Sequence, residues 1–124
     1  MSKYSISKEI FSENGSTAIT SLINGGNGNL YIGFTSMDHP VYEYDTATGK
    51  SRDIGLMFNP PANNIPLEDK VHNSLAMDEN GILYIGQGLN INWDARPYGY
   101  SLQKYGGGHL FTYDTKTGRI SGYI

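Results

Sequence analysis

One stretch of the chain gathers side chains suited to recognising a ligand. Residues 88–107 contain the single tryptophan, three of the ten tyrosines, one aspartate and one arginine. Aromatic rings stack on the apolar C–H faces of sugars, while carboxylate, amide and guanidinium groups hydrogen-bond to hydroxyls. The pattern favours a carbohydrate ligand; in the alternative interpretation, the rings of Trp93 and Tyr98 fold back and cover the base of the segment. The predicted binding residues are Trp93, Asp94, Arg96, Tyr98, Tyr100 and His109.

The three histidines offer a second kind of chemistry. Imidazole titrates near neutrality and binds metals in its neutral form, so His72 is a candidate general base or metal ligand. However, His72 corresponds to Ile19 in the repeat described below, so this chain contains no ring of equivalent histidines. An isolated histidine is more often a hydrogen-bonded packing residue. We therefore name His72 only as a candidate catalytic residue, and we predict no metal site and no cofactor.

Composition narrows the classes of function. The 124 residues carry a net charge of −3, and lysine and arginine form no cluster, so we expect no nucleic-acid partner. No apolar run is long enough to span a bilayer, so we expect no membrane segment in this sequence. The absence of cysteine excludes disulfides and thiolate metal sites. The compartment stays open: cytoplasmic as written, extracytoplasmic if a signal sequence has been removed.

Two motifs occur twice, in the same order. The stretch NGNLYIG at 27–33 matches NGILYIG at 80–86, which begins 53 residues later. The stretch YDTATGK at 44–50 matches YDTKTGR at 113–119, which begins 69 residues later. The second copy therefore carries 16 additional residues between its two motifs. Self-similarity at this spacing indicates a repeat architecture.

Each motif predicts a hairpin. Asn-Gly favours a two-residue type I′ turn, in which both residues adopt positive φ. In Asp-Thr-x-Thr-Gly, the aspartate caps the turn and the glycine takes the left-handed conformation, which explains Asp45 and Asp114 without a catalytic role. Helical periodicity is absent. The predicted strands are 18–23, 30–34, 41–44 and 50–54 in the first copy, and 74–78, 83–87, 110–113 and 119–123 in the second.

Four short antiparallel strands in about 40–50 residues are typical of a propeller blade. The motifs resemble blades of bacterial two-component sensor propellers, which usually carry tryptophan where Tyr31 and Tyr84 stand. They are also similar to propellers of the polysaccharide-lyase and virginiamycin-lyase type, in which a stretch like Gly108-His109-Leu110 often opens the third strand. The resemblance implies an all-β fold: two four-stranded antiparallel β-propeller blades, forming part of a larger propeller.

This interpretation divides the chain into segments. We expect a strand of an adjoining blade in 1–17, blade one in 18–57, an inter-blade link in 58–70, and blade two in 71–124 with an inserted loop at 88–107. Two blades are too few to close a propeller, which has four to eight. The partners are therefore either the remaining blades of a longer chain, of which this is a fragment, or other copies of this chain.

Strand direction places the short hairpin turns on one face of the predicted disc and the irregular segments on the other. Loops that gather on one face of a rigid scaffold commonly carry function. We expect a ligand-binding or interaction surface there, with carbohydrate the favoured ligand. The alternative, implied by the resemblance to lyase propellers, is a polysaccharide or small-molecule lyase or hydrolase that uses His72 at the channel mouth, with Arg96 or Tyr98 stabilising negative charge. A third possibility is the sensory domain of a membrane receptor.

Overall fold

The computed structural model describes residues 9, 12, 16–36, 40–55, 67–91 and 108–123. Within these ranges the chain forms strands and turns and no helix, which confirms the all-β prediction. The strands are β1 (Ser16–Asn24), β2 (Asn29–Ser36), β3 (Val41–Asp45), β4 (Ser51–Asp53), β5 (Leu67–Lys70), β6 (Leu75–Met77), β7 (Ile82–Ile91), β8 (His109–Asp114) and β9 (Ile120–Tyr123).

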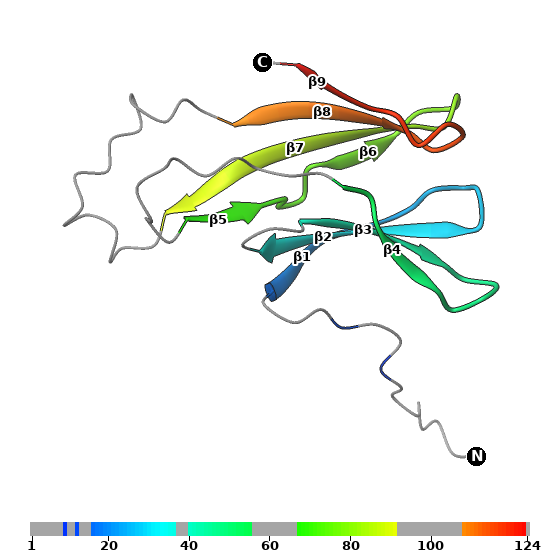
Figure 1. The fold of residues 1–124 in the computed structure, drawn as a ribbon, viewed down its shortest axis with the longest axis horizontal. Helices are drawn as coiled ribbons and strands as arrows, with labels where there is room; N and C mark the ends of the chain where they lie inside the picture. Colours follow the sequence, from blue (N-terminus) through cyan, green and yellow to red (C-terminus); the bar gives the residue numbers. More distant parts are fainter. Residues whose placement is uncertain are drawn as a thin grey trace, which may run out of the picture.

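Two four-stranded antiparallel sheets make up the fold, as predicted. Strands β1 to β4 pair in sequence order to form the first sheet, and β6 to β9 pair in the corresponding order to form the second. The four hairpin turns lie at one end of the molecule, on the right in Figure 1. Strand β5, the end of β7 and the start of β8 lie at the other end. The short turns are thus separated from the irregular end of the sheets.

Strand β5 joins the two sheets at the irregular end. Lys70 lies opposite Thr35 of β2 on one side and opposite Gly88 of β7 on the other. Through this strand the two sheets form one nine-stranded hydrogen-bonded sheet. We expected residues 67–70 to belong to a link and 88–91 to a loop. Both are strands because β5 satisfies the backbone groups of β7 beyond the end of β6.

The Asn-Gly hairpins differ from the predicted type I′ turn. Gly28 and Gly81 have φ of 89° and 83°, but neither Asn27 nor Asn80 has a positive φ. The amide of Gly25 donates to the carbonyl of Asn29 at 2.9 Å, and the corresponding bond in the second sheet joins Asp78 and Ile82 at 3.0 Å. Each loop therefore holds three residues rather than two, and its last residue takes the conformation that glycine favours. In the first loop Gly26 also has a positive φ, of 72°.

The Asp-Thr-x-Thr-Gly hairpins form as predicted. The Asp45 carboxylate accepts bonds from the amides of Ala47 and Thr48 at 2.8 and 3.2 Å, and Asp114 does the same for Lys116 and Thr117. These backbone bonds lower the pKa of the Asp45 and Asp114 carboxyls. Both aspartates therefore serve the turns.

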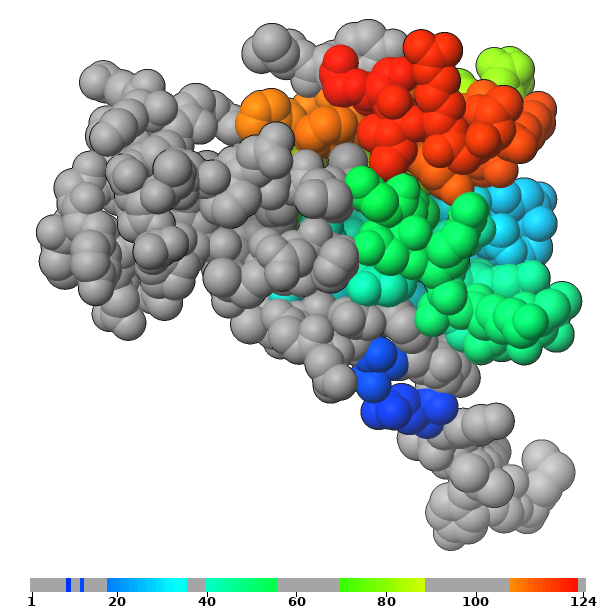
Figure 2. All heavy atoms as spheres, in the orientation of Figure 1, coloured from blue at the N-terminus to red at the C-terminus, as the bar shows by residue number. Residues whose placement is uncertain are grey.

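The main core lies between the two sheets. Tyr31 and Val41 of the first sheet pack with Leu83, Ile85 and Tyr113 of the second, and all five are fully or almost fully buried. The rings of Tyr31 and Tyr113 meet edge to face with centroids 6.4 Å apart. Figure 2 shows the atoms of β9 directly against the green segment that follows β4. Each sheet thus has a near face, turned toward the other sheet, and an outer face, turned away.

A second cluster lies on the outer face of the first sheet. Ile32, Phe34 and Tyr42 alternate along their strands with the residues of the main core, and all three are buried. The rings of Phe34 and Tyr42 contact edge to face at 5.7 Å. Both faces of the first sheet therefore carry packed apolar side chains, which is typical of an interior sheet rather than an edge layer.

The two sheets stack in the same sense rather than as mirror images. In the shared motif, Tyr31 matches Tyr84 and Ile32 matches Ile85. Tyr31 lies on the near face of the first sheet, whereas Tyr84 is exposed on the outer face of the second. Ile85 packs in the main core, whereas Ile32 belongs to the outer cluster of the first sheet. The face that the first sheet presents to the second is therefore equivalent to the outer face of the second.

Candidate functional site

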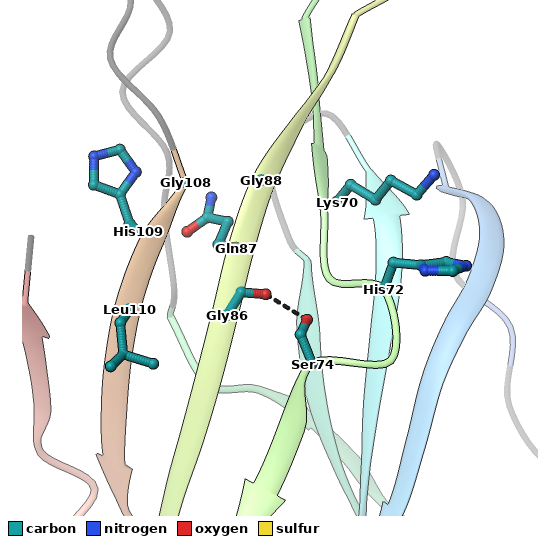
Figure 3. Close-up of a pocket in the computed structure, with 9 residues that line it drawn as sticks. All are labelled: Lys70, His72, Ser74, Gly86, Gln87, Gly88, Gly108, His109 and Leu110. Atoms are coloured by element: carbon teal, nitrogen blue, oxygen red, sulfur yellow. Dashed lines mark hydrogen bonds between the residues drawn. The ribbon is translucent and has the colours of Figure 1, made fainter.

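A hollow opens at the irregular end of the second sheet, where β5, β7 and β8 converge. Its volume is about 510 Å³. Figure 3 shows the strands β7 and β8 and the turn before β6 that border it. The residues that define its floor and rim are Lys70, His72, Ser74, Gly86, His109 and Leu110.

Glycine and serine form the floor of the hollow. The Ser74 hydroxyl donates to the carbonyl oxygen of Gly86, as the dashed line in Figure 3 marks. A Cβ atom on Gly86 would lie 3.0 Å from the Ser74 Cβ, and one on Gly108 would lie 2.7 Å from the carbonyl oxygen of Gln87. These glycines allow close approach of the backbone, and they leave the surface above Gly86 without a side chain.

The corresponding place on the first sheet is filled by Val71. A Cβ on Gly33, the counterpart of Gly86, would lie 2.8 Å from Val71 Cγ1 and 3.0 Å from the Ser21 Cβ. The Val71 amide donates to the carbonyl of Phe34 at 3.3 Å, and its carbonyl accepts from the Thr20 hydroxyl at 2.6 Å. Val71 is therefore held on the first sheet by both its side chain and its backbone. The equivalent place on the second sheet, above Gly86, is the open hollow.

Of the residues predicted to form a site, two line the hollow. His72 is exposed and His109 is half-buried, with its ring 5.9 Å from that of Phe111. In Figure 3 the two imidazoles extend to opposite sides of β7. The structure therefore does not bring them together as a catalytic pair. The remaining predicted binding residues lie outside the described residues: Trp93, Asp94, Arg96, Tyr98 and Tyr100.

Within the described ranges, no group of three histidine, cysteine, aspartate or glutamate side chains is placed to hold a metal ion. In the same part of the chain, no helix is long and apolar enough to cross a membrane.

Gln87 beside the hollow is a buried amide that the sequence analysis missed. It is 4% exposed, and its Nε2 and Oε1 atoms have no hydrogen-bond partner among the described residues. In the repeat its counterpart is Phe34, an apolar residue. A buried amide without partners costs about 1–3 kcal/mol of stability relative to one that is hydrogen-bonded.

We expect Gln87→Met to raise the free energy of unfolding by about 1 kcal/mol. Methionine preserves the length and approximate volume of the side chain and removes two polar groups that have no partner in the described part of the chain. Chemical denaturation monitored by circular dichroism measures the change. Gln87→Glu provides the opposite control, because a buried carboxylate without a partner should destabilise the fold. A loss of stability in the methionine variant would show that the amide makes a bond needed for folding.

A network of hydrogen-bonded polar side chains links the near faces of the two sheets. The Tyr31 hydroxyl donates to Glu43 at 2.8 Å, and Arg52 donates to both Glu43 and the Tyr113 hydroxyl, at 3.0 and 2.6 Å. Burial, followed by the influence of Glu43, raises the pKa of Tyr31 to about 12. Tyrosine therefore stays protonated and keeps donating across the whole physiological range.

The outer face of the second sheet carries uncharged residues where the near face of the first carries this network. Thr112 stands at the position of Glu43, and Ser121 at that of Arg52. Tyr84 and Leu110 are exposed on the same face, at the positions of the buried Tyr31 and Val41. This face therefore has the shape and alternation of a buried sheet face, with neutral polar groups in place of charges.

Together these features define an all-β protein of two equivalently stacked sheets, with one hollowed, largely uncharged outer face. No family model, curated protein or solved structure matches the chain. Its function is therefore argued from the geometry of that face.

Proposed function

We propose that this chain is a segment of a β-propeller-type assembly and that it functions as an interaction module. The outer face of its second sheet binds a further four-stranded sheet of the same kind, supplied by the same longer chain or by another copy. For the inserted segment, of which 92–107 lies outside the described residues, carbohydrate is the ligand class we propose.

The observation that supports the proposal is that two equivalent glycines differ in what covers them. Gly33 is covered by Val71, which lies between β5 and β6, while Gly86, its counterpart, forms the floor of an open hollow of about 510 Å³. A sheet packed on the second sheet as the second packs on the first would place a side chain above Gly86. It would also bury Tyr84 and Leu110, which is favourable because about 25 cal/mol is gained per Å² of apolar surface removed from water.

Same-sense stacking favours a propeller-type assembly over a closed sandwich. In a sandwich, two sheets bury one face each and leave polar outer faces in water. Here the outer cluster of the first sheet is apolar and buried, and the outer face of the second carries exposed tyrosine and leucine. In an array of repeated sheets each sheet contacts only its neighbours, so a further sheet is required to cover an exposed apolar face such as that of the second sheet.

A tandem protein tests this function directly. Two full copies of the chain joined by a flexible linker place a first sheet at high effective concentration beside the second sheet of the preceding copy. We expect hydroxyl-radical footprinting to show Tyr84 of the first copy protected several-fold relative to the same residue in a tandem protein that carries Leu110→Arg in the first copy. This variant is the matched control, because the arginine should keep a sheet from packing on that face. Equal reactivity of Tyr84 of the first copy in the two proteins would exclude this face as a binding surface for such a sheet.

A further inference from the structure

We infer that the partner of the second sheet's outer face is the β1 side of the first sheet in a second copy of this chain, bound head to tail. This inference rests on the proposed function and names the occupant of the face. It derives from the distribution of exposed apolar side chains and from the counterpart of Val71 in the sequence.

The exposed large apolar residues of the described ranges lie on two surfaces. Tyr84 and Leu110, 39% and 45% exposed, lie on the outer face of the second sheet. Ile19 and Leu22, 55% and 58% exposed, lie on β1 opposite Phe34 and Ile32, and hence on the outer face of the first sheet. Ile32, Phe34 and Tyr42, elsewhere on the outer face of the first sheet, are already buried within one copy, so β1 is the part of that face left exposed. By the same-sense stacking, the outer face of the second sheet corresponds to the near face of the first, and β1 corresponds to the segment before β6 that packs on that near face.

In the repeat, strand β1 corresponds to the segment before β6, which packs on Gly33 of the first sheet through Val71. Val71 and Ser74 precede β6 in the second sheet, and the residues 53 positions earlier are Ala18 and Ser21 of β1. Ala18 is exposed. When β1 of a second copy packs as the segment before β6 packs within one copy, Ala18 lies above Gly86. Ile19 and Leu22 then follow the same strand across the apolar face.

Lys70 lies at the rim of the hollow, but the side chains that alternate across the face around Gly86 carry no charge. Tyr84, Leu110 and Thr112 alternate along β7 and β8 on this face, and none is ionised at neutral pH. The side chains of Ala18, Ile19 and Leu22 are apolar as well. Burying a charge without a partner opposes formation of a protein interface, and none of these six side chains brings a charge into the contact.

The contact is heterologous, so it repeats around an axis. A head-to-tail interface leaves one free face at each end of every oligomer until the last copy meets the first. Propeller-type rings hold four to eight sheets, so closure takes about two to four copies of a two-sheet chain. The expected product is a single closed oligomer rather than an open series of sizes.

The experiment uses two complementary variants of the full chain, and light scattering measures their masses. Leu22→Arg disables the first-sheet surface and Leu110→Arg disables the second-sheet surface; both side chains are exposed, so the fold is kept, and circular dichroism verifies it. We expect the unaltered protein to form one discrete oligomer and each variant alone to be a monomer. An equal mixture should form only the 1:1 dimer, because one intact surface of each kind remains.

Other outcomes overturn the inference. If either variant associates with itself, the contact joins like surfaces rather than unlike ones. If the unaltered chain is a monomer, or the mixture does not pair, the second copy is not the partner. When Tyr84 is nevertheless protected in the tandem protein, the proposed function stands and only this inference fails. A gain-of-function variant adds a positive test. With Ala18→Val, a valine side chain would lie above Gly86 of the other copy, as Val71 lies above Gly33, and association should strengthen about three- to tenfold.

Discussion

Gly33→Ala should destabilise the protein by about 2–3 kcal/mol, whereas Gly86→Ala should cost less than about 1 kcal/mol. At both positions the added Cβ would lie 3.0 Å from the Cβ of a serine, which is Ser21 of β1 for Gly33 and Ser74, just before β6, for Gly86. Only at Gly33 does it also meet a second side chain, Val71, at 2.8 Å from Cγ1 and 3.1 Å from Cβ. The difference between the two variants therefore isolates the cost of displacing Val71 from the first sheet.

Backbone conformation does not complicate this comparison. Neither Gly33 nor Gly86 has a φ in the left-handed range, so alanine adopts the native backbone at both positions. Val71 cannot yield easily, because its amide and carbonyl are bonded to Phe34 and Thr20 and its side chain is fully buried. Overpacking of a tight core costs about 1–3 kcal/mol because the surrounding backbone must shift.

Urea denaturation of the two variants measures these energies, and a double variant provides the control. Val71→Ala removes the Cγ1 atom, so Gly33→Ala should cost markedly less in that background than in the unaltered protein. Equal costs of Gly33→Ala and Gly86→Ala would show that Val71 does not pack rigidly on Gly33. In that case the hollow above Gly86 could not be interpreted as the place where a partner inserts a side chain equivalent to Val71.

Local sequence signals were sufficient to predict the eight strands of the two four-stranded sheets and the pairing within each sheet. The Asp45 and Asp114 hairpins depend on bonds within a few residues, so the motif alone determines them. Short hairpins join β1 to β2, β3 to β4, β6 to β7 and β8 to β9, and the rest of the order follows because strands that are consecutive in sequence usually pair. At the Asn-Gly hairpins the loop length and the conformation of the asparagine were predicted wrongly, although Gly28 and Gly81 take the positive φ that the pattern requires.

Burial was not predictable in the same way. Tyr31 and Tyr84 occupy the same place in the same motif, yet one is buried and the other exposed. The motif specifies which face of the strand each tyrosine occupies, but the neighbouring sheet decides whether that face meets protein or water. A single-strand pattern contains no information about that neighbour, so the hollow and its exposed rim became visible only in three dimensions.

The bridging strand β5 escaped prediction for a related reason. Residues 67–70 have no alternation of apolar and polar side chains, since three of the four are charged. They form a strand because β2 and β7 both present backbone groups at that end of the sheets. The burial of Gln87 was not predictable from its residue type either. A polar side chain suggests a surface position, whereas its place on β7 buries it.

Tyr31→Ala should cost about 3–5 kcal/mol, and Tyr84→Ala less than about 1 kcal/mol. Tyr31 is fully buried, its ring packs on Tyr113, and its hydroxyl bonds to both Glu43 and Asn27. Truncation leaves a cavity between the sheets and removes a donor from the Glu43 carboxylate. Many domains have a total stability of only about 5–15 kcal/mol, so this single variant should leave the protein close to unfolding at room temperature.

The matched tyrosines also separate folding from association. Tyr84 makes one long bond, at 3.4 Å to Asp78, and its ring is partly in water, so its loss should leave the melting temperature nearly unchanged. The same variant should weaken the association measured by light scattering, because Tyr84 lies on the outer face of the second sheet. Thermal denaturation at low protein concentration, where copies are apart, keeps the two effects distinct. Equal loss of stability in both variants would mean that Tyr84 contributes as much as Tyr31 to the stability of a single copy. In that case a partner would not be needed to complete the outer face.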